Sequence, residues 1–310
     1  MSKILITGGA GFIGSSLALS LLAKGHTLAV VDNLFSGKRD YVPKEAKFYE
    51  LDILSQDLSQ VFSDFKPDYV FHLAAQIDVR KSVADPGFDS DVNIKGGLRV
   101  LEQCQKNQVK KIIFSSTGGA IYGEAEIIPT PETYEAKPLS PYGINKLAFE
   151  HYLRYYKEVF SQDYTVLRFA NVYGPRQYKG GEAGVIAIFC QQAVLNQPLT
   201  LNGSGEQTRD FVYINDVVKA LEASLSHDYS GELNIGFGKE SALLEVIKAL
   251  ELASGKTLEI IKNPAPKGEQ QRSCLDNSLA KKVLNWRPEV DLLKGIELTY
   301  NWSQDNLNKL

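Results

Sequence analysis

The sequence predicts an α/β fold in which a doubly wound parallel sheet is covered by helices on both faces. Two observations carry this prediction. Strand-like and helix-like segments alternate through the first half of the chain, and a glycine-rich turn directly follows the first strand-like run. Length adds a third, because 310 residues exceed the usual size of one domain and predict an additional lobe.

Six apolar runs are typical of buried strands: Ile4–Thr7, Leu28–Val31, Lys47–Leu51, Tyr69–Leu73, Lys111–Ser115 and Thr165–Ala170. Between them lie four helical patterns: Ile13–Lys24, Asp57–Phe65, Asn93–Lys106 and Tyr142–Phe160. Such alternation indicates a parallel sheet buried on both faces. Six strands match a Rossmann-type nucleotide-binding sheet.

The pattern loosens after Asn171, where glycine and proline become frequent. We therefore expect residues 1–171 to form the nucleotide-binding domain and residues 172–310 to form a smaller α/β substrate-binding lobe. The segment around 210–225 is expected to return to the first domain, which would make the second lobe discontinuous.

Composition excludes several classes of protein. A formal charge of −3 argues against a nucleic-acid-binding surface, which is normally basic. Three widely spaced cysteines argue against a disulfide framework or a zinc site and favour a reducing compartment. The chain opens on a strand-like run, and the apolar stretch Leu17–Ala23 is too short to span a bilayer. We predict a cytoplasmic protein with no membrane partner and no metal.

The first strand leads into the glycine-rich turn TGGAGFIG, in which Gly8, Gly11 and Gly14 are regularly spaced. Glycine allows a tight turn and lets backbone amides approach a pyrophosphate closely. The helix that begins near Phe12 would direct its N-terminal N–H groups at that anion. Because a strand precedes the turn and a helix follows it, the motif predicts dinucleotide binding.

Asp32 ends the second strand, 18 residues after Gly14. That is about the spacing of the carboxylate that binds the adenosine ribose hydroxyls in such folds. A carboxylate there would repel a 2′-phosphate, so NAD is favoured over NADP. The alternative is that Asp32 only caps a turn before Asn33.

Tyr142 and Lys146 form the single Tyr-x-x-x-Lys of the chain. On a helix these positions share a face, so the phenol and the ammonium would lie side by side. A free tyrosine has a pKa of about 10 and is a poor base at neutral pH, but a neighbouring cation favours the phenolate. The pair therefore predicts a catalytic base, although an ordinary exposed helix pair has the same spacing.

The segment FSSTGGAIYG (114–123) stands at the end of the fifth predicted strand. Ligands of open α/β sheets bind at the carboxyl ends of the strands. A hydroxyl group here is therefore a candidate for bonding a sugar oxygen, while a plain Ser/Thr/Gly turn is the alternative.

With these motifs the chain resembles extended short-chain dehydrogenases/reductases of the NAD-dependent epimerase/dehydratase family. More narrowly, it resembles UDP-glucose/UDP-N-acetylglucosamine 4-epimerases. The segments that carry the resemblance are TGGAGFIG, HLAA, SSTGGAIYG, SPYGINK, NVYGPRQ and GEQTRDFVYINDV, which occur in the family's order along essentially the whole chain.

The resemblance implies that Thr117 hydrogen-bonds the sugar 4-hydroxyl, Tyr142 is the base, and Lys146 tunes it and binds the nicotinamide ribose. Asp52 and Ile53 would line the adenine. The whole set implied for NAD is Gly8, Gly11, Phe12, Ile13, Gly14, Asp32, Asn33, Ser36, Gly37, Asp52, Ile53, Leu73, Ala74, Ala75, Asn93, Tyr142, Lys146 and Phe169, with Leu73 to Ala75 at the cofactor's central portion and Asn93 supporting the active-site backbone.

In the second lobe the resemblance implies that Asn171, Arg209 and Arg272 hold the nucleotide diphosphate. Surface arginines and a loop-capping asparagine are the alternative. Ser273 matches the position that limits the space beside the sugar's C2 group. Because serine is small, an N-acetyl group should fit, and activity on UDP-N-acetylglucosamine as well as UDP-glucose is expected.

The implied reaction is epimerisation at C4 through transient oxidation to a 4-keto sugar. Related dehydratases and decarboxylases carry an acid directly after the Ser/Thr, where this chain has Gly118 and Gly119. Three alternatives stay open: a uronate 4-epimerase using Arg80 or Lys81, a one-way reductase, and a non-catalytic NAD-binding protein. The helices Asn93–Lys106 and Tyr142–Phe160 resemble those that pair into the family's homodimer interface.

Overall fold

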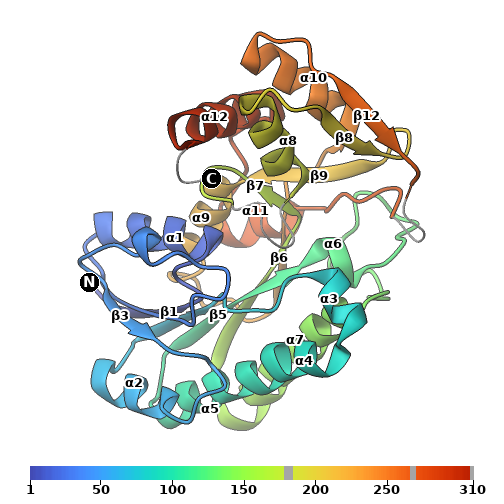
Figure 1. Cartoon of the computed structure of the whole chain (residues 1–310). Helices are drawn as coiled ribbons and strands as arrows, with labels where there is room; N and C mark the ends of the chain where they lie inside the picture. The colour runs from blue at the N-terminus through green and yellow to red at the C-terminus, as the bar shows by residue number, and fades with distance from the viewer. Residues whose placement is uncertain (178–183, 266–269, 308–310) are drawn as a thin grey trace.

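A seven-stranded parallel sheet organises the chain in the computed structural model, which describes residues 1–177, 184–265 and 270–307 (Figure 1). The strand order is β10-β6-β5-β4-β1-β2-β3. The strands are β1 (Lys3–Thr7), β2 (Thr27–Asp32), β3 (Lys47–Glu50), β4 (Tyr69–His72), β5 (Lys111–Thr117), β6 (Asp163–Phe169) and β10 (Glu232–Ile235).

All six predicted strands lie in this sheet, and the predicted fold class is confirmed. The seventh strand, β10, pairs with the outer edge of β6. It was missed because it has only four residues and lies in the loosely patterned second half, 63 residues after the end of β6 at Phe169.

Helices cover both faces of the sheet. This agrees with β1, whose successive apolar side chains point to opposite faces. Ile4 and Ile6 face one core with α1 (Phe12–Ala23) and α9 (Ile214–Ala223). Leu5 faces the other core, and the helices there are α2 (Leu58–Phe65), α5 (Gly97–Lys106) and α7 (Pro141–Phe160). Figure 1 shows α1 and α9 above the sheet and α2, α5 and α7 below it.

Shorter elements follow the strands at their carboxyl ends. The chain forms η1 (Arg39–Tyr41) after β2, then α3 (Val79–Ala84), α4 (Pro86–Ser90) and the π-helix η2 (Asp91–Gly96) after β4, and α6 (Gly118–Ile121) after β5. These segments lie where the sequence predicts ligand contacts.

The second half builds two small sheets. β7 (Asn171–Tyr173), β9 (Thr208–Tyr213) and β11 (Glu240–Ala242) form one, and β8 (Leu199–Asn202) with β12 (Ile260–Asn263) forms the other. The remaining helices are α8 (Val185–Val194), α10 (Leu243–Ser254), α11 (Ser278–Leu284) and α12 (Leu292–Asp305). Within the described ranges, the structure contains no helix long and apolar enough to cross a membrane.

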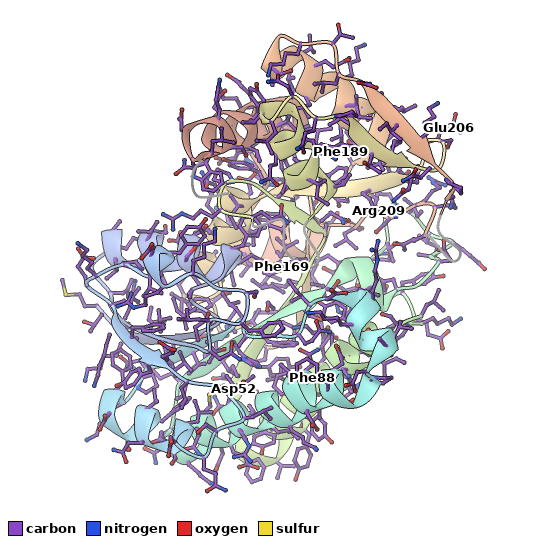
Figure 2. The ribbon with its side chains drawn as sticks, viewed as in Figure 1. Asp52, Phe88, Phe169, Phe189, Glu206 and Arg209 are labelled. Carbon is purple, nitrogen blue, oxygen red and sulfur yellow. The ribbon has the colours of Figure 1, made fainter. Side chains whose placement is uncertain are left out.

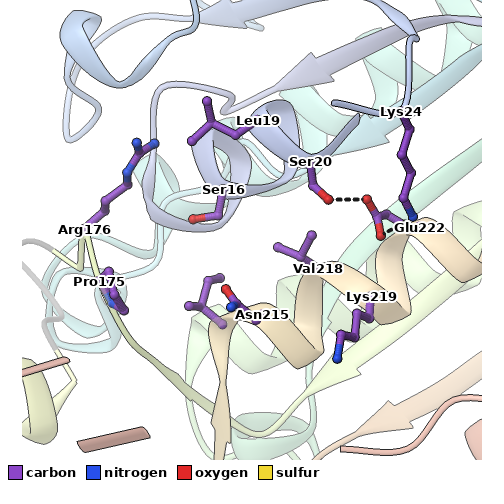
Figure 3. A pocket seen from close by; sticks show the side chains of 11 residues that line it. Ser16, Leu19, Ser20, Lys24, Pro175, Arg176, Asn215, Val218, Lys219 and Glu222 are labelled. Atoms are coloured by element: carbon purple, nitrogen blue, oxygen red, sulfur yellow. Dashed lines mark hydrogen bonds and ion pairs between the residues drawn. The ribbon is translucent and has the colours of Figure 1, made fainter. Parts of the chain in front are cut away.

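Between β9 and β11 the chain comes back to the large sheet through α9 and β10. Glu222 on α9 accepts a hydrogen bond from Ser20 on α1 (2.5 Å) and pairs with Lys24, the residue after that helix (2.7 Å) (Figure 3). A cavity of about 640 Å³ lies beside these contacts, and Arg176 and Lys219 are among its lining residues. Since none of the predicted site residues lines it, we attribute this cavity to the packing of α1 against α9.

Candidate functional site

The glycine turn after β1 has two glycines that the fold itself requires. Gly8 has a φ of +73°, and a Cβ on it would lie 2.6 Å from the backbone nitrogen of Ala74. A Cβ on Gly14 would lie 2.2 Å from the carbonyl oxygen of Gly8. At Gly11 a Cβ would meet one atom within 4 Å, that same carbonyl oxygen at 3.3 Å. Gly11 therefore presents an open face.

The start of α1 fits an anion. The helix begins at Phe12. Its N-cap residue is Gly11, so no side chain caps the first N–H groups of the helix. The first N–H groups of a helix lack intrahelical partners and carry positive partial charge. Phe12 and Ile13 thus lie where a pyrophosphate would be bound, beside the open face of Gly11. This arrangement fits NAD.

Asp32 braces the turn from the end of β2. Its side chain is only 8% exposed, and it accepts hydrogen bonds from the N–H groups of Ala10 and Leu34, both at 2.9 Å. Burial raises the pKa of this carboxyl and the two hydrogen bonds oppose that rise. The bond to Leu34 means that Asp32 does cap the turn. A carboxylate accepts about four hydrogen bonds, so about two remain for ribose hydroxyls.

The residues predicted for the adenosine end lie around the loops that follow β2 and β3. Asn33 donates to the Asp52 carboxylate (2.8 Å), which also accepts from the N–H of Leu54 (2.8 Å). Ile53 is buried against Gly96. The remaining members of the set, Ser36 and Gly37, follow in the loop after β2, where Gly37 packs against Ala10. Figure 2 labels Asp52.

The end of β4 is tied to β1 through Thr7. Its hydroxyl is hydrogen-bonded to Nδ1 of His72 (2.8 Å) and accepts from the N–H of Ala74 (3.3 Å), while its carbonyl accepts from Leu73 (3.1 Å). Burial, and secondarily the charge of Lys146, lower the pKa of His72 to about 3. His72 is therefore neutral at working pH, while the hydrogen bonds of Thr7 hold the backbone of Leu73 and Ala74.

The catalytic candidates meet at the ends of β5 and α7. The helix starts with Pro141 at its first position, and Ser140 caps it by accepting from Gly143 (3.2 Å). Lys146 Nζ lies 5.8 Å from the centre of the Tyr142 ring and donates to the carbonyl of Ser115 (3.0 Å).

Thr117 lies two residues beyond Ser115 on β5, so both side chains leave the strand on the same side. Phe169 on β6 is its register partner. The structure therefore brings Thr117, Tyr142 and Lys146 to one corner of the sheet.

Lys146 is almost fully buried, and this changes its chemistry. Burial lowers the pKa of its ammonium group to about 8, while the carboxylates of Asp89 and Glu150 oppose that decrease. The group is therefore positively charged at neutral pH. A cation held in so dry a place stabilises a nearby phenolate more strongly than one in water would.

Of the predicted substrate residues, Asn171 lies beside Thr117. A Cβ on Gly119 would lie 3.9 Å from Oγ1 of Thr117 and 4.0 Å from Oδ1 of Asn171, so these two polar groups flank the same glycine. Arg209 lies on β9 and donates to the carbonyl of Thr208 (2.8 Å). Figure 2 shows Arg209 in the upper part of the molecule and Phe169 near the junction between the two parts.

Arg272 is held differently from the prediction. It forms a two-pronged ion pair with Glu240 on β11, with N–O distances of 2.9 and 2.6 Å, although its own side chain is 61% exposed. A diphosphate would have to compete with that carboxylate, so its predicted role stays a prediction. The next residue, Ser273, is buried.

Comparison with known proteins identifies the family. Residues 4–236 match the model of the NAD dependent epimerase/dehydratase family. The chain belongs to this family. A UDP-glucose 4-epimerase of Mycolicibacterium smegmatis is 40% identical over 303 residues, covering 96% of this chain and 97% of that protein.

Solved structures of this family are similar over the whole chain. The UDP-glucose 4-epimerase of Thermotoga maritima, solved with UDP-glucose, has a TM-score of 0.96 at 44% identity and covers 98% of this chain and 99% of its own. The UDP-glucose 4-epimerase of Thermus thermophilus, solved as a complex with NAD, has a TM-score of 0.94 at 41% identity with the same coverage.

Asn93 belongs to a buried network of hydrogen bonds between the loop after β4 and helix α7. From the π-helix η2, Asn93 accepts from the backbone N–H of Gln76 (3.1 Å) and donates to its carbonyl (2.9 Å). The side chain of Gln76 donates to Asp89 (2.7 Å), which also accepts from Asn145 (2.7 Å). Asn145 directly precedes Lys146, so the network links the loop after β4 to helix α7.

A second network, which sequence reasoning missed, lies behind β5. Ser116 donates to Glu150 (2.5 Å), and Glu150 forms a buried ion pair with Arg168 (2.6 Å). Arg168 in turn donates to the hydroxyl of Tyr122 (2.9 Å). Glu150 comes four residues after Lys146, so the helical period that singled out Tyr142 and Lys146 was the available signal.

Proposed function

We propose that this chain interconverts UDP-hexoses that differ in configuration at C4, with NAD as its resident cofactor. One observation carries the proposal: Lys146 is anchored on Ser115 beside the ring of Tyr142, with Thr117 two residues farther along the same strand. Family membership and the two UDP-glucose 4-epimerase structures support it.

When bound, NAD supplies the hydride acceptor and donor that a change at C4 requires. The chain's own residues handle the proton and the orientation. Tyr142, as the phenolate, removes the proton of the 4-hydroxyl, and Lys146 stabilises that phenolate. Thr117 hydrogen-bonds the same oxygen. The proton returns from Tyr142 when C4 is reduced on its other face. Because the hydride taken from C4 is also returned, no net redox change occurs.

Epimerisation needs a firmly held nucleotide and a loosely held sugar, because the 4-keto sugar has to turn over. Arg209 and Arg272 are the proposed charged contacts to the diphosphate, with Asn171 beside them. For Arg272 this requires that the diphosphate displace Glu240. The residues at the sugar end are small or neutral: Thr117, Gly119 and Ser273.

Elimination of water is disfavoured by packing as well as by composition. A Cβ on Gly118 would lie 2.4 Å from the side chain of Leu275, so an acidic side chain has no room directly after Thr117. Gly119 also lacks a side chain. The acid that dehydratase chemistry would need is therefore missing at both positions, which favours an epimerase.

The sugar range follows from Ser273. Its side chain is small and buried, and the resemblance to 4-epimerases implies that it lies beside C2 of the sugar. We propose that UDP-N-acetylglucosamine and UDP-N-acetylgalactosamine are substrates alongside UDP-glucose and UDP-galactose.

The test is to incubate the purified holoenzyme separately with UDP-galactose, UDP-N-acetylgalactosamine and UDP-galacturonate and to resolve the products. The first two should be converted to their C4 epimers with no net formation of NADH. Conversion of the uronate alone, or net NADH turnover, would overturn the proposal. A Tyr142→Phe variant should lose turnover, while Tyr69→Phe, at the amino end of the central strand β4, should keep it.

Three further expectations belong to the same proposal. We propose a boundary near residue 171 between the NAD-binding and substrate-binding lobes, and a cytoplasmic location, which the three free, buried cysteines support. We also propose a homodimer through α7. Its exposed side chains include Tyr152, Tyr155 and Phe160, which are 39%, 51% and 45% exposed. Sedimentation equilibrium should give twice the chain mass.

A further inference from the structure

Asp210 is a buried carboxylate directly beside Arg209, and the predicted site does not include it. Consecutive residues of a strand point to opposite faces, so Asp210 turns inward where Arg209 does not. Its side chain is fully buried. One oxygen accepts from the N–H of Phe237 (2.7 Å), and the other accepts from Gly238 (3.1 Å) and Leu275 (3.1 Å).

The contacts require a carboxylate rather than any polar group. All three backbone partners are donors. The thiol of Cys274 lies 3.9 Å from Oδ2, the oxygen that also accepts from Gly238 and Leu275. A Cβ on Gly236 would lie 2.2 Å from that oxygen, so the backbone encloses the group closely. Burial raises the pKa of Asp210 to about 6, and the backbone hydrogen bonds oppose that rise. An asparagine would place an NH₂ group against N–H donors.

The donors come from two separate segments. Phe237 and Gly238 follow β10 of the large sheet, whereas Leu275 comes just after Ser273. Asp210 itself lies on β9 of the small sheet. One side chain thus joins β9, the end of β10 and the segment that carries Ser273.

Leu275 continues the connection to the catalytic corner. Its side chain packs against Gly118, where a Cβ would lie only 2.4 Å away, and Gly118 follows Thr117. The neighbouring backbone is paired with Thr130, whose N–H donates to the carbonyl of Cys274 (2.9 Å). Segment 273–275 is therefore held between Asp210 on one side and the turn after Thr117 on the other.

We propose that Asp210 is a positioning residue for the reaction, which fixes the segment carrying Ser273 relative to Thr117. The inference rests on the proposed function. A sugar that turns over between these two residues needs a pocket of constant width, and a displacement of about 1 Å in an active site can lower a rate by about 100-fold.

The test compares Asp210→Asn with Asp216→Asn in the holoenzyme. Asp216 is a matched control because it is also fully buried and accepts two backbone N–H groups, from Glu289 and Val290 (both 3.0 Å), away from the catalytic corner. Both variants should lose stability. Only Asp210→Asn should lower kcat for UDP-galactose, by about tenfold to 100-fold, with the Kd for UDP within about threefold of wild type.

Hydrogen exchange of residues 273–276 gives a second readout that does not depend on the reaction. Exchange there should accelerate in Asp210→Asn and not in Asp216→Asn. Unchanged exchange, unchanged kcat, or equal kcat losses in both variants would overturn the inference. A parallel loss of UDP affinity would place the damage at the nucleotide and also overturn it.

A second variant covers the case in which Asp210→Asn does not fold. Leu275→Ala leaves the carboxylate and its backbone donors in place and removes the contact to Gly118, so it should lower kcat similarly. Wild-type kcat in Leu275→Ala would overturn the inference. Wild-type activity is measured first, because a wild-type protein that converts no UDP-sugar would instead refute the proposed function itself.

Discussion

Gly11 and Gly14 belong to one turn, yet the structure gives them different tasks, which alanine at each position should separate. A Cβ at Gly14 would lie 2.2 Å from the carbonyl oxygen of Gly8 and 2.7 Å from Cα of Gly9, both backbone atoms. Ordinary contact requires roughly 3.4 Å or more, so the backbone would have to move by roughly 1 Å. At Gly11 the single contact, at 3.3 Å, needs almost no movement.

The expected effects are therefore opposite in kind. Gly14→Ala should lower the free energy of unfolding by about 1–3 kcal/mol, the usual cost of overpacking. Gly11→Ala should change it by less than about 1 kcal/mol, because its φ of −80° suits alanine. Gly11→Ala should nevertheless weaken NAD binding by about 10-fold to 100-fold, since each hydrogen bond to a charged group contributes about 1.5–3 kcal/mol.

Urea unfolding of the cofactor-free protein measures the first quantity, and calorimetric titration with NAD⁺ measures the second. Gly87→Ala on α4 is the control, because its Cβ would meet nothing closer than 3.4 Å. If Gly11→Ala binds NAD⁺ as tightly as wild type, the open face of Gly11 is not where the cofactor approaches. If Gly14→Ala is as stable as wild type, the steric argument is wrong.

Three other predictions follow from the same geometry. Ser273→Tyr should abolish conversion of UDP-N-acetylgalactosamine and leave that of UDP-galactose within about tenfold of wild type; equal retention of both in product assays would contradict the steric role. Folding holds the pKa of His72 near 3, below its unfolded value of about 6.5. As the pH is lowered, the unfolded state therefore takes up the proton first. The free energy of unfolding should decrease by about 3 kcal/mol between pH 6.5 and pH 4. His72→Gln should remove this part of the pH dependence in urea unfolding, and an unchanged dependence would show that His72 does not cause it. Arg168→Met should destabilise the chain by about 3–5 kcal/mol because Glu150 is left as a buried unpaired charge, and Glu150→Gln in the same chain should recover part of that loss; no recovery would refute the charge argument.

The parts of the molecule that sequence predicted well depend on local patterns. The turn after β1 needs a strand, three glycines and a helix within a few residues, and Tyr142 with Lys146 needs only the helical period. The end of β5 was located because strand ends in parallel sheets share an edge. In each case the chemistry and the structure that positions it lie within one short stretch of chain.

The parts that sequence missed depend on partners distant in the chain. Tyr122 bonds Asn234 from 112 residues away, and Asp210 bonds Leu275 from 65 residues away. No period or motif predicts such a pair, because either residue alone also fits a solvated loop. Arg272 shows the opposite case. Its local sequence predicts a guanidinium group that binds an anionic ligand, but in the structure Arg272 is paired with Glu240, which is distant in the chain.

The missed strand β10 explains how the two halves of the site share one geometry. Its last residues lead directly into Gly236 and Phe237, whose backbone surrounds the Asp210 carboxylate. Within the strand, Asn234 is fully buried. It donates to the carbonyl of Thr130 (3.0 Å), which is paired with segment 273–275, and to that of Asp276 (3.2 Å), which follows this segment. Because β10 pairs along β6, whose end lies beside Thr117, the large sheet sets the position of the wall of the proposed sugar pocket. The segment that carries Ser273 is thus positioned by the same sheet that carries Thr117, although about 155 residues separate the two in the chain.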